Sequence, residues 1–76
     1  MEYLPVESAT LMALGYDQVG CVLEVEFRQG AVYRYSGVPV ELYHQLLSSP
    51  SKGQFFNCKI RNHFPFIQMP VVGKTI

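Results

Sequence analysis

The sequence has few residues of the kinds that build metal centres and disulfide frameworks. Cys21 and Cys58 are its only cysteines, and together with His44 and His63 they lack the spacing of a zinc finger or zinc ribbon. One cysteine pair without a secretory context is more typical of two reduced, partly buried thiols than of a disulfide bond. We therefore expect no metal site and no cofactor.

Long apolar runs and targeting signals are also missing. No apolar stretch approaches the roughly 20 residues that a membrane-spanning helix needs. Glu2 stands where a signal peptide would carry basic residues, and no apolar core segment follows it. The sequence therefore predicts a cytoplasmic protein with no membrane partner.

Motifs of catalysis are absent as well. No nucleophile is paired with a base at a recognisable spacing, and the sequence has no glycine-rich phosphate loop. A thiol–imidazole pair of Cys58 with His63 or His44 is conceivable, but a helical cysteine beside Phe55 more often serves in packing. We expect a protein that is not an enzyme.

What the sequence does contain is enough apolar material for one small domain. Of its 76 residues, 49% are apolar and 13% are aromatic, which is too much for a disordered chain. We interpret residues 1–76 as a single domain. A chain of this length buries only about 60% of the surface of its unfolded state, so a second subunit or a ligand would add to a thin stability.

Charge is distributed unevenly, although the net charge is zero. No acidic residue follows Glu41, whereas the segment beyond it contains both histidines and the cations Lys52, Lys59, Arg61 and Lys74. Overall neutrality argues against a long groove that follows the phosphates of duplex or extended nucleic acid. A basic face on the C-terminal half could hold a few phosphates, or the two halves could simply pair their charges.

Strand patterns occupy the first half of the chain. Residues 8–17 are read as a short strand that ends in a turn with Gly15, and a helix is the alternative for their Leu-Met-Ala-Leu core. Residues 21–27 alternate between apolar and polar, which predicts a half-buried strand. Residues 28–30 fit a three-residue hairpin loop with Gly30 in the left-handed conformation, and a second strand follows over residues 31–36.

The length of this loop sets the register of the hairpin and the role of Tyr33-Arg34-Tyr35. On a strand such a triplet can form a nucleotide-stacking surface, or its two Tyr can pack in the core while its Arg points to water. A three-residue loop predicts three cross-strand pairs, namely Val25 with Tyr33, Leu23 with Tyr35, and Glu24 with Arg34. This register puts the apolar side chains on one face, so we favour the core position for both Tyr and an ion pair for Arg34.

Two helices are predicted after this hairpin. Pro39 suits the first position of a helix, and Ser48-Ser49-Pro50 ends it. Ser51, with Gln54 three residues on, can cap a second helix that ends at Pro65. In that helix Phe56, Ile60 and Phe64 form an apolar stripe, whereas Phe55 falls away from it. The fold predicted is α+β, with a small antiparallel sheet of about three strands followed by two helices packed on one face.

Together these residues resemble a known family, the KTSC domain, which is the C-terminal domain of some lysyl-tRNA synthetases. The resemblance spans about residues 8–66 and rests on the ordered spacing of Ser8…Gly15-Tyr16-Asp17, Leu23-x-Val25-x-Phe27, Gly30, Tyr33-x-Tyr35, Val38-Pro39, Tyr43-x-x-Leu46 and Ser51-x-Gly53-x-Phe55-Phe56-Asn57-x-x-Ile60-Arg61. The family also occurs as small free-standing bacterial and phage proteins, and this chain is similar to that form. The resemblance implies a suspected RNA-binding role. Residues 67–76 form an apolar tail outside it, which we expect to pack on the body or on another subunit.

The start of the second helix is the predicted ligand site. Free N–H groups and the helix dipole at Ser51-Lys52-Gly53 favour a phosphate, although Ser51 could simply cap the helix and Gly53 simply allow close packing. The residues that follow would hold a base and its edge. The predicted ligand-binding residues are Ser51, Lys52, Gly53, Phe55, Asn57, Lys59, Arg61 and Asn62, with Tyr33, Arg34 and Tyr35 as secondary candidates.

The function predicted from these features is non-enzymatic binding of a nucleotide-type ligand. A neutral chain with one basic and aromatic face suits a small phosphorylated or cyclic nucleotide better than duplex nucleic acid. In a phage protein, such binding would sequester a host nucleotide signal without catalysis. The alternatives are binding of a short single strand of RNA, and a protein-interaction module in which an exposed Phe55 and the apolar tail form a homo-oligomer.

Overall fold

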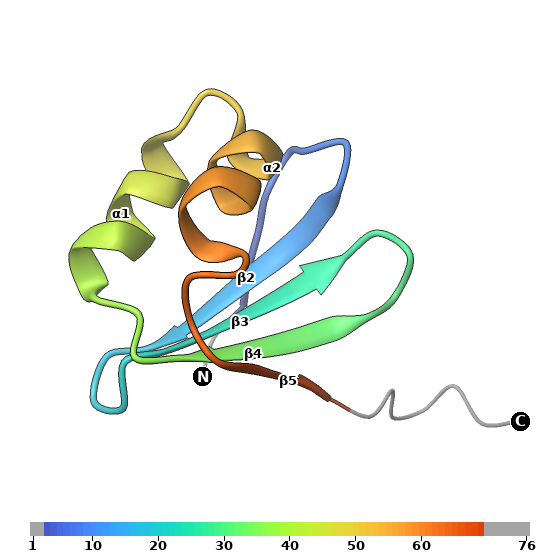
Figure 1. The fold of residues 1–76 in the computed structure, drawn as a ribbon. Helices are drawn as coiled ribbons and strands as arrows, with labels where there is room; N and C mark the ends of the chain where they lie inside the picture. The colour runs from blue at the N-terminus through green and yellow to red at the C-terminus, as the bar shows by residue number, and fades with distance from the viewer. Residues whose placement is uncertain (1–2, 70–76) are drawn as a thin grey trace, which may run out of the picture.

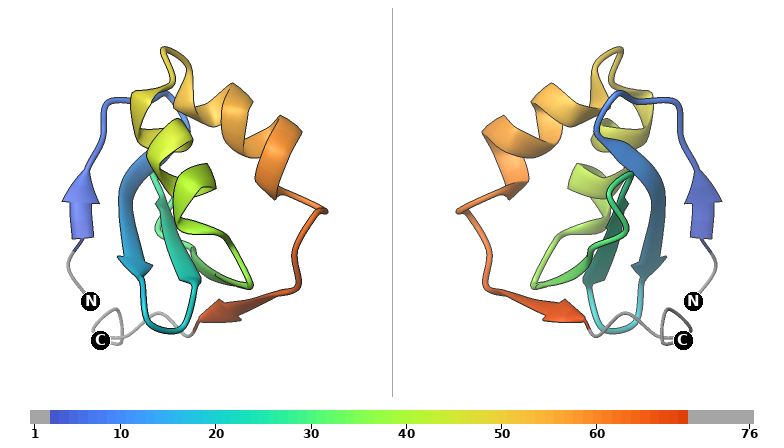
Figure 2. Two further views of the ribbon diagram at one scale, coloured as in Figure 1. Left: turned by 90° about the vertical axis from the view of Figure 1, so that its left-hand side faces the viewer. Right: turned by 90° about the vertical axis from the view of Figure 1, so that its right-hand side faces the viewer.

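The structure, a computed structural model, describes residues 3–69 and combines a five-stranded antiparallel sheet with a short helical layer (Figure 1). The strands lie in the sheet in the order of the sequence, β1-β2-β3-β4-β5. Both helices cover the same face of the sheet (Figure 2). The elements are β1 (Tyr3–Pro5), β2 (Leu11–Asp17), β3 (Val22–Phe27), β4 (Val32–Ser36), α1 (Val40–Ser48), α2 (Lys52–Phe55), a π-helical turn η1 (Phe56–Ile60) and β5 (Phe66–Met69).

The prediction of about three strands is therefore wrong, because β1 and β5 extend the sheet at its two edges. Each edge strand is short and largely exposed, so it lacks the alternation of buried and exposed residues that marks a strand in a sequence. The helices also do not simply follow the sheet. They lie in sequence between β4 and β5, and β5 returns to pair antiparallel with β4.

The β3–β4 hairpin has the predicted register. Glu24 pairs with Arg34, Val25 with Tyr33, and Leu23 with Tyr35. The loop is closed by the Phe27 N–H, which donates to the Ala31 carbonyl at 2.9 Å. Gly30 has a φ of 106°, a conformation that glycine adopts at little cost.

Strand β2 contains a bulge that the sequence analysis did not predict. Leu11 pairs with Phe27 and Ala13 with Glu26, which leaves Met12 as the extra residue. The bulge brings Leu11 to the same buried side as Leu14, although the two are three positions apart in the sequence. The predicted strand over residues 8–17 thus begins at Leu11.

The core lies between the sheet and the helices. Its buried residues come from β2, β3 and β4, from the segment that follows β4, and from α1 and η1: Leu11, Leu14, Leu23, Val25, Tyr35, Val38, Tyr43, Leu46, Phe56 and Ile60. Tyr16 of β2 and Tyr43 of α1 stack with their ring centroids 4.6 Å apart. These contacts fix the helical layer over one end of the sheet.

The second helix differs from the prediction at both ends. Ser51 makes no side-chain capping bond; instead the Ser51 N–H donates to the Ser49 hydroxyl oxygen at 3.2 Å. The helix ends at Ile60 rather than at Pro65, and its last turn is π-helical. Phe55, predicted to point away from the apolar stripe, is half-buried against the core. Helix α2 contacts α1 as well as η1, so two successive residues, about 100° apart on a helix, can both face protein.

The predicted apolar tail is only partly described. Its first residues lie in β5, where Ile67 pairs with Arg34 and Met69 with Val32, so this part packs on the body of the same chain. Residues 70–76 lie outside the described residues. Within residues 3–69, no helix is long and apolar enough to cross a membrane.

Candidate functional site

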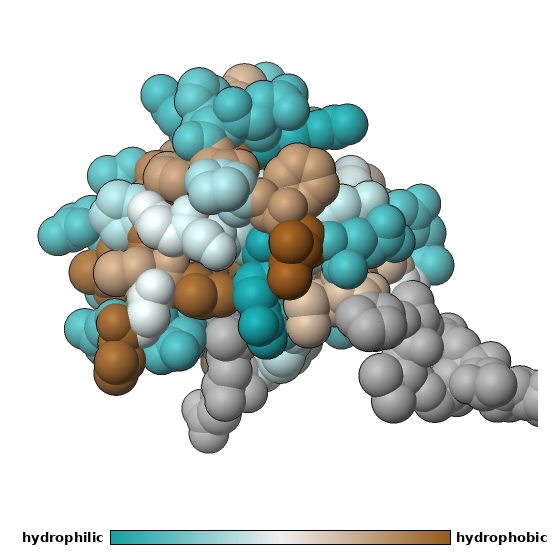
Figure 3. Space-filling model, turned by 60° about the horizontal axis from the view of Figure 1, so that its bottom comes forward, coloured by the Kyte–Doolittle hydropathy of each residue, from teal (hydrophilic) through white to brown (hydrophobic). Residues whose placement is uncertain are grey.

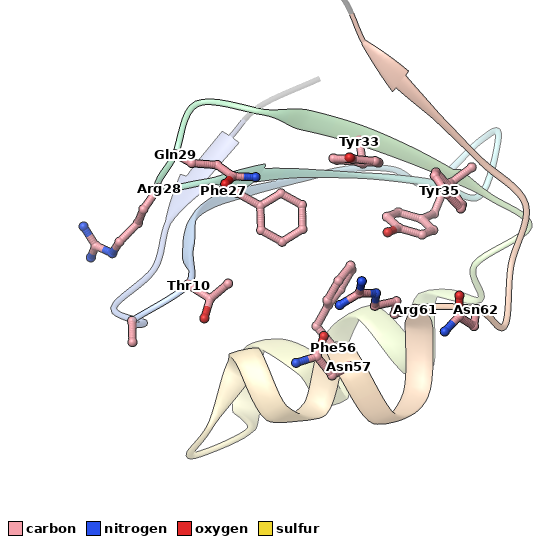
Figure 4. A pocket seen from close by; sticks show the side chains of 12 residues that line it. Thr10, Phe27, Arg28, Gln29, Tyr33, Tyr35, Phe56, Asn57, Arg61 and Asn62 are labelled. Carbon is pink, nitrogen blue, oxygen red and sulfur yellow. The ribbon is translucent and has the colours of Figure 1, made fainter.

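A groove of about 610 Å³ lies between the sheet and the second helical segment (Figure 4). The side chains of Phe27, Tyr33 and Tyr35 lie on the sheet side of it, and those of Phe56 and Arg61 reach toward them from the helical side (Figure 4). The described residues that line it are Ala9, Thr10, Phe27, Arg28, Gln29, Tyr33, Tyr35, Phe56, Asn57, Arg61, Asn62 and Phe66.

Aromatic rings form most of the walls of this groove. Tyr35 lies 5.4 Å from Phe56 and 5.4 Å from Phe66, measured between ring centroids. Tyr33 lies 5.5 Å from Phe66 and 5.6 Å from Phe27. Four of these rings are buried or half-buried, whereas Phe66 is 49% exposed. The groove therefore presents one accessible aromatic face, held in place by rings behind it.

The π-helical turn brings Arg61 to the groove. The Arg61 N–H donates to the Phe56 carbonyl at 2.9 Å, which is the i to i+5 bond of a π turn. In such a turn the residue five positions on returns to nearly the same side, so Arg61 joins Phe56. In an ordinary α-helix, the residue that lies on the same side as Phe56 would be Ile60, four positions later.

A tight turn then positions Asn62. Arg61 has φ −61° and ψ 131°, Asn62 has φ 67°, and the His63 N–H donates to the Ile60 carbonyl at 3.0 Å. These values describe a type II turn with Asn62 at the position that needs a positive φ. Asn is one of the few residues other than Gly that tolerate this conformation.

The two cations at the groove are used differently. The Arg28 Nε donates to the Ser8 carbonyl at 2.6 Å, and its guanidinium points away from the other side chains (Figure 4). Arg61 has no salt bridge to any of the described residues. Burial raises the pKa of Tyr35, while the positive charge of Arg61 acts in the opposite direction. Arg61 is therefore the cation that faces the groove.

Comparison with known proteins supplies the family. The model of the KTSC domain matches residues 7–64. The chain belongs to the KTSC domain family. A crystal structure of a KTSC domain protein from Yersinia pestis is 36% identical, with a TM-score of 0.87 over 91% of this chain and 97% of that chain.

Other relatives of this KTSC domain differ in length. A protein of Stutzerimonas stutzeri is 46% identical over 75% of this chain and 80% of its own length. A lysine–tRNA ligase of Nostoc punctiforme is 38% identical over 87% of this chain, but the match covers only 12% of the ligase. The domain thus occurs both in short chains and as a small part of a large enzyme.

The predicted site residues of this KTSC domain fall into separate places. Asn57, Arg61 and Asn62 line the groove together with Tyr33 and Tyr35. Ser51, Lys52 and Gly53 instead line a smaller cleft of about 380 Å³, which shares Ala9, Thr10 and Asn57 with the groove. Phe55 and Lys59 are not among the described lining residues of either cleft.

The predicted phosphate position at the helix start is not supported by its surroundings. The Lys52 ammonium donates to the Ser49 carbonyl at 3.1 Å, so its charge is turned back to the end of α1. The segment assigned as α2 is only four residues long.

Arg34, the third secondary candidate, lies on the other face of the sheet. Its guanidinium forms an ion pair with Glu24, which also accepts a hydrogen bond from the Tyr3 hydroxyl. Figure 3 views the molecule from below, where apolar and polar side chains are interspersed. Arg34 does not line the groove.

The sequence analysis missed several residues of the groove. Phe66 was given no role in the predicted site, Phe27 was assigned to a strand, and Phe56 was assigned to an apolar stripe. A signal for Phe66 existed, because it is the first residue after Pro65 and begins an apolar segment that can pair with a strand. Among the described residues, no group of three or more His, Cys, Asp or Glu side chains is placed to hold a metal ion.

Proposed function

We propose that the groove binds a nucleotide-type ligand without catalysis. Its base would stack on Phe66 and its phosphate would contact Arg61. The observation that carries this proposal is the combination, in one groove, of a half-exposed aromatic ring and a cation that has no acidic partner among residues 3–69.

Stacking is the main contribution expected. Phe66 is 49% exposed, and its ring is held against Tyr33 and Tyr35 at centroid distances of 5.5 Å and 5.4 Å. A preorganised ring loses little conformational freedom when a base covers it. Stacking of a base on an aromatic side chain contributes about 1–3 kcal/mol.

The polar residues of the groove suit the other parts of a nucleotide. Asn57 and Asn62 each have a side-chain amide with N–H donors and a carbonyl acceptor. The edge of a base presents the complementary acceptors and donors. The Thr10 hydroxyl lies across the groove from them (Figure 4). The volume of about 610 Å³ falls within the range of about 300–1,000 Å³ usual for small-molecule sites.

Binding can be tested with two neighbouring variants on β5. Phe66 lines the groove, whereas Ile67 is 58% exposed and pairs with Arg34 on the opposite face. Isothermal titration of nucleosides and nucleotides should give an affinity that Phe66→Ala lowers by about tenfold or more. Ile67→Ala should leave this affinity unchanged.

Two results would contradict the proposal. One is a thermal-shift and calorimetric screen in which no nucleoside or nucleotide binds the unaltered protein. The other is an equal loss of affinity in both variants, which would show that β5 acts only through stability. Chromatography of the ligand after incubation checks for turnover, which we do not expect.

A second candidate, favoured by the match to lysine–tRNA ligases, is a single-stranded RNA in the same groove. A strand would add contacts beyond one nucleotide, so a tetranucleotide would bind much more tightly than a mononucleotide. Its affinity would also rise more steeply as the salt concentration falls. Equal affinities for the two ligands would favour the small-nucleotide proposal.

A further inference from the structure

We infer that the ligand of this groove presents a single phosphate, as in a nucleoside monophosphate or a cyclic mononucleotide, rather than a di- or triphosphate chain. This inference rests on the proposed function and narrows it. It is argued from the charges that the described residues place in and around the groove.

The two cations that line the groove, Arg28 and Arg61, differ in direction. Arg28 donates through Nε to the Ser8 carbonyl at 2.6 Å, and its guanidinium is directed outward (Figure 4). Arg61 lies between the aromatic walls and has no acidic partner within residues 3–69. A guanidinium can form two parallel hydrogen bonds to the oxygens of one phosphate. Arg61 therefore matches one phosphate group.

The other cations of the described chain are directed elsewhere. Lys52 donates to the Ser49 carbonyl, and Arg34 is paired with Glu24 on the opposite face of the sheet. Lys59 is exposed and lines neither cleft. A second and third phosphate would thus find no further described cation directed into the groove.

The groove also lacks the groups that would hold a metal-bound triphosphate. Among its described lining residues none is acidic. Protein sites for magnesium nucleotides usually supply at least one carboxylate to the metal. A nucleoside triphosphate with its magnesium would therefore gain nothing from this groove over a monophosphate.

Calorimetric titration with adenosine, AMP, cyclic AMP, ADP and ATP, and with the matching guanosine series, tests this inference. With the base that binds better, the monophosphate or the cyclic nucleotide should bind about tenfold or more tightly than the nucleoside. The di- and triphosphate should bind within about threefold of the monophosphate, with or without magnesium. Affinity should fall with salt at a slope close to that of one phosphate contact.

Matched arginine variants assign the contact. Arg61→Gln should reduce monophosphate affinity to that of the nucleoside and leave nucleoside binding unchanged. Arg28→Gln should preserve the gain from the phosphate. Arg61→Lys, which keeps the charge but not the bidentate geometry, should retain the salt dependence with a lower affinity. Circular dichroism confirms that each variant is folded.

The outcomes separate this inference from the proposed function. A triphosphate that binds tenfold or more tightly than the monophosphate would overturn the inference and leave nucleotide binding intact. An equal loss of phosphate discrimination in Arg28→Gln and Arg61→Gln would do the same. Failure of every nucleoside and nucleotide to bind would overturn the proposed function, and the inference with it.

Discussion

Arg34 Nη2 lies 2.5 Å from Glu24 Oε2, directly across the β3–β4 hairpin. In this pair the Arg34 side chain lies on the sheet face opposite the groove, whereas the rings of Tyr33 and Tyr35 line the groove. One triplet therefore serves both faces of the sheet. The cation stabilises the hairpin, and the rings shape the site.

Replacement of Arg34 by Ala should lower stability and leave ligand affinity unchanged. The Glu24 side chain is only 9% exposed, and loss of a charged partner at a buried group costs about 1–3 kcal/mol. Urea unfolding measures the first effect and calorimetric titration the second. A loss of affinity without a loss of stability would show that Arg34 contacts the ligand.

Stability should also depend on the ionisation of Glu24 in acid. Burial opposes this ionisation, but hydrogen bonds from Tyr3 and Arg34 outweigh burial and lower the pKa of Glu24. A group whose pKa is lower in the folded state contributes its full stabilisation at pH values above its unfolded-state pKa, about 4.3 here. This contribution is lost as the pH falls through the folded-state pKa.

Urea unfolding between neutral and acid pH measures this contribution of Glu24. Glu24→Gln should remove part of the acid dependence. Identical pH profiles for Glu24→Gln and the unaltered protein would contradict the assignment.

At alkaline pH Tyr16 is one of the groups on which stability should depend. Burial, followed by its neighbour Cys21, raises the pKa of Tyr16 to about 12, and its hydroxyl donates to the Val38 carbonyl. A raised folded-state pKa gives stability that is complete below the unfolded pKa of about 10 and is lost as pH rises from there through about 12. Tyr16→Phe should remove part of this loss, as measured by urea unfolding together with phenolate absorbance, and the rest should remain because burial also raises the pKa of Tyr3 to about 12. If the free energy of unfolding of Tyr16→Phe fell with rising pH just as it does in the unaltered protein, the assignment to Tyr16 would be wrong.

The sequence was sufficient to predict the central hairpin because its alternation extends over two neighbouring strands. Cross-strand pairs of Leu23, Glu24 and Val25 with Tyr35, Arg34 and Tyr33 agree with only one loop length. By contrast, β1 and β5 are edge strands whose pairing depends on the finished sheet, and their exposed residues carry no periodic signal. The sheet was therefore predicted two strands too small.

The site was predicted in part, for a reason that lies in one helical turn. An α-helical spacing groups Phe55 with Lys59, and this grouping placed both in the predicted site. The i to i+5 bond between Phe56 and Arg61 brings Arg61 to the groove. Phe55 packs against the core because α2 also contacts α1. Periodicity alone does not indicate where a helix widens into a π turn.

Gly53 should tolerate a side chain. A Cβ at this position would meet the side-chain oxygens of Ser8 and Thr10 at 3.5 Å, which is ordinary contact. Gly53→Ala should therefore raise the free energy of unfolding by about 0.5–1 kcal/mol, because Ala favours the helix more than Gly does. Gly30→Ala is the contrasting variant, because its φ of 106° disfavours any side chain, and it should lose stability in the same urea assay. A loss in Gly53→Ala would show that the glycine is needed for close packing.

Asn62 should have two separable roles, in the turn and in the groove. Its φ of 67° disfavours residues with a Cβ, at a cost of about 1–2 kcal/mol for an ordinary side chain. Asn62→Ala should thus be destabilised by about this amount or somewhat less, whereas Asn62→Gly should keep the turn and stay near the stability of the unaltered protein.

Both variants at position 62 lack the amide, so a contact with the ligand should be lost equally in each. Affinity measured well below the unfolding temperature should fall by the same factor in Asn62→Ala and Asn62→Gly, about three- to tenfold for one hydrogen bond. If affinity fell only in the destabilised Ala variant, Asn62 would act through the turn, by holding Arg61 in place. Because the Gly variant keeps the type II turn without the amide, this comparison separates shape from contact.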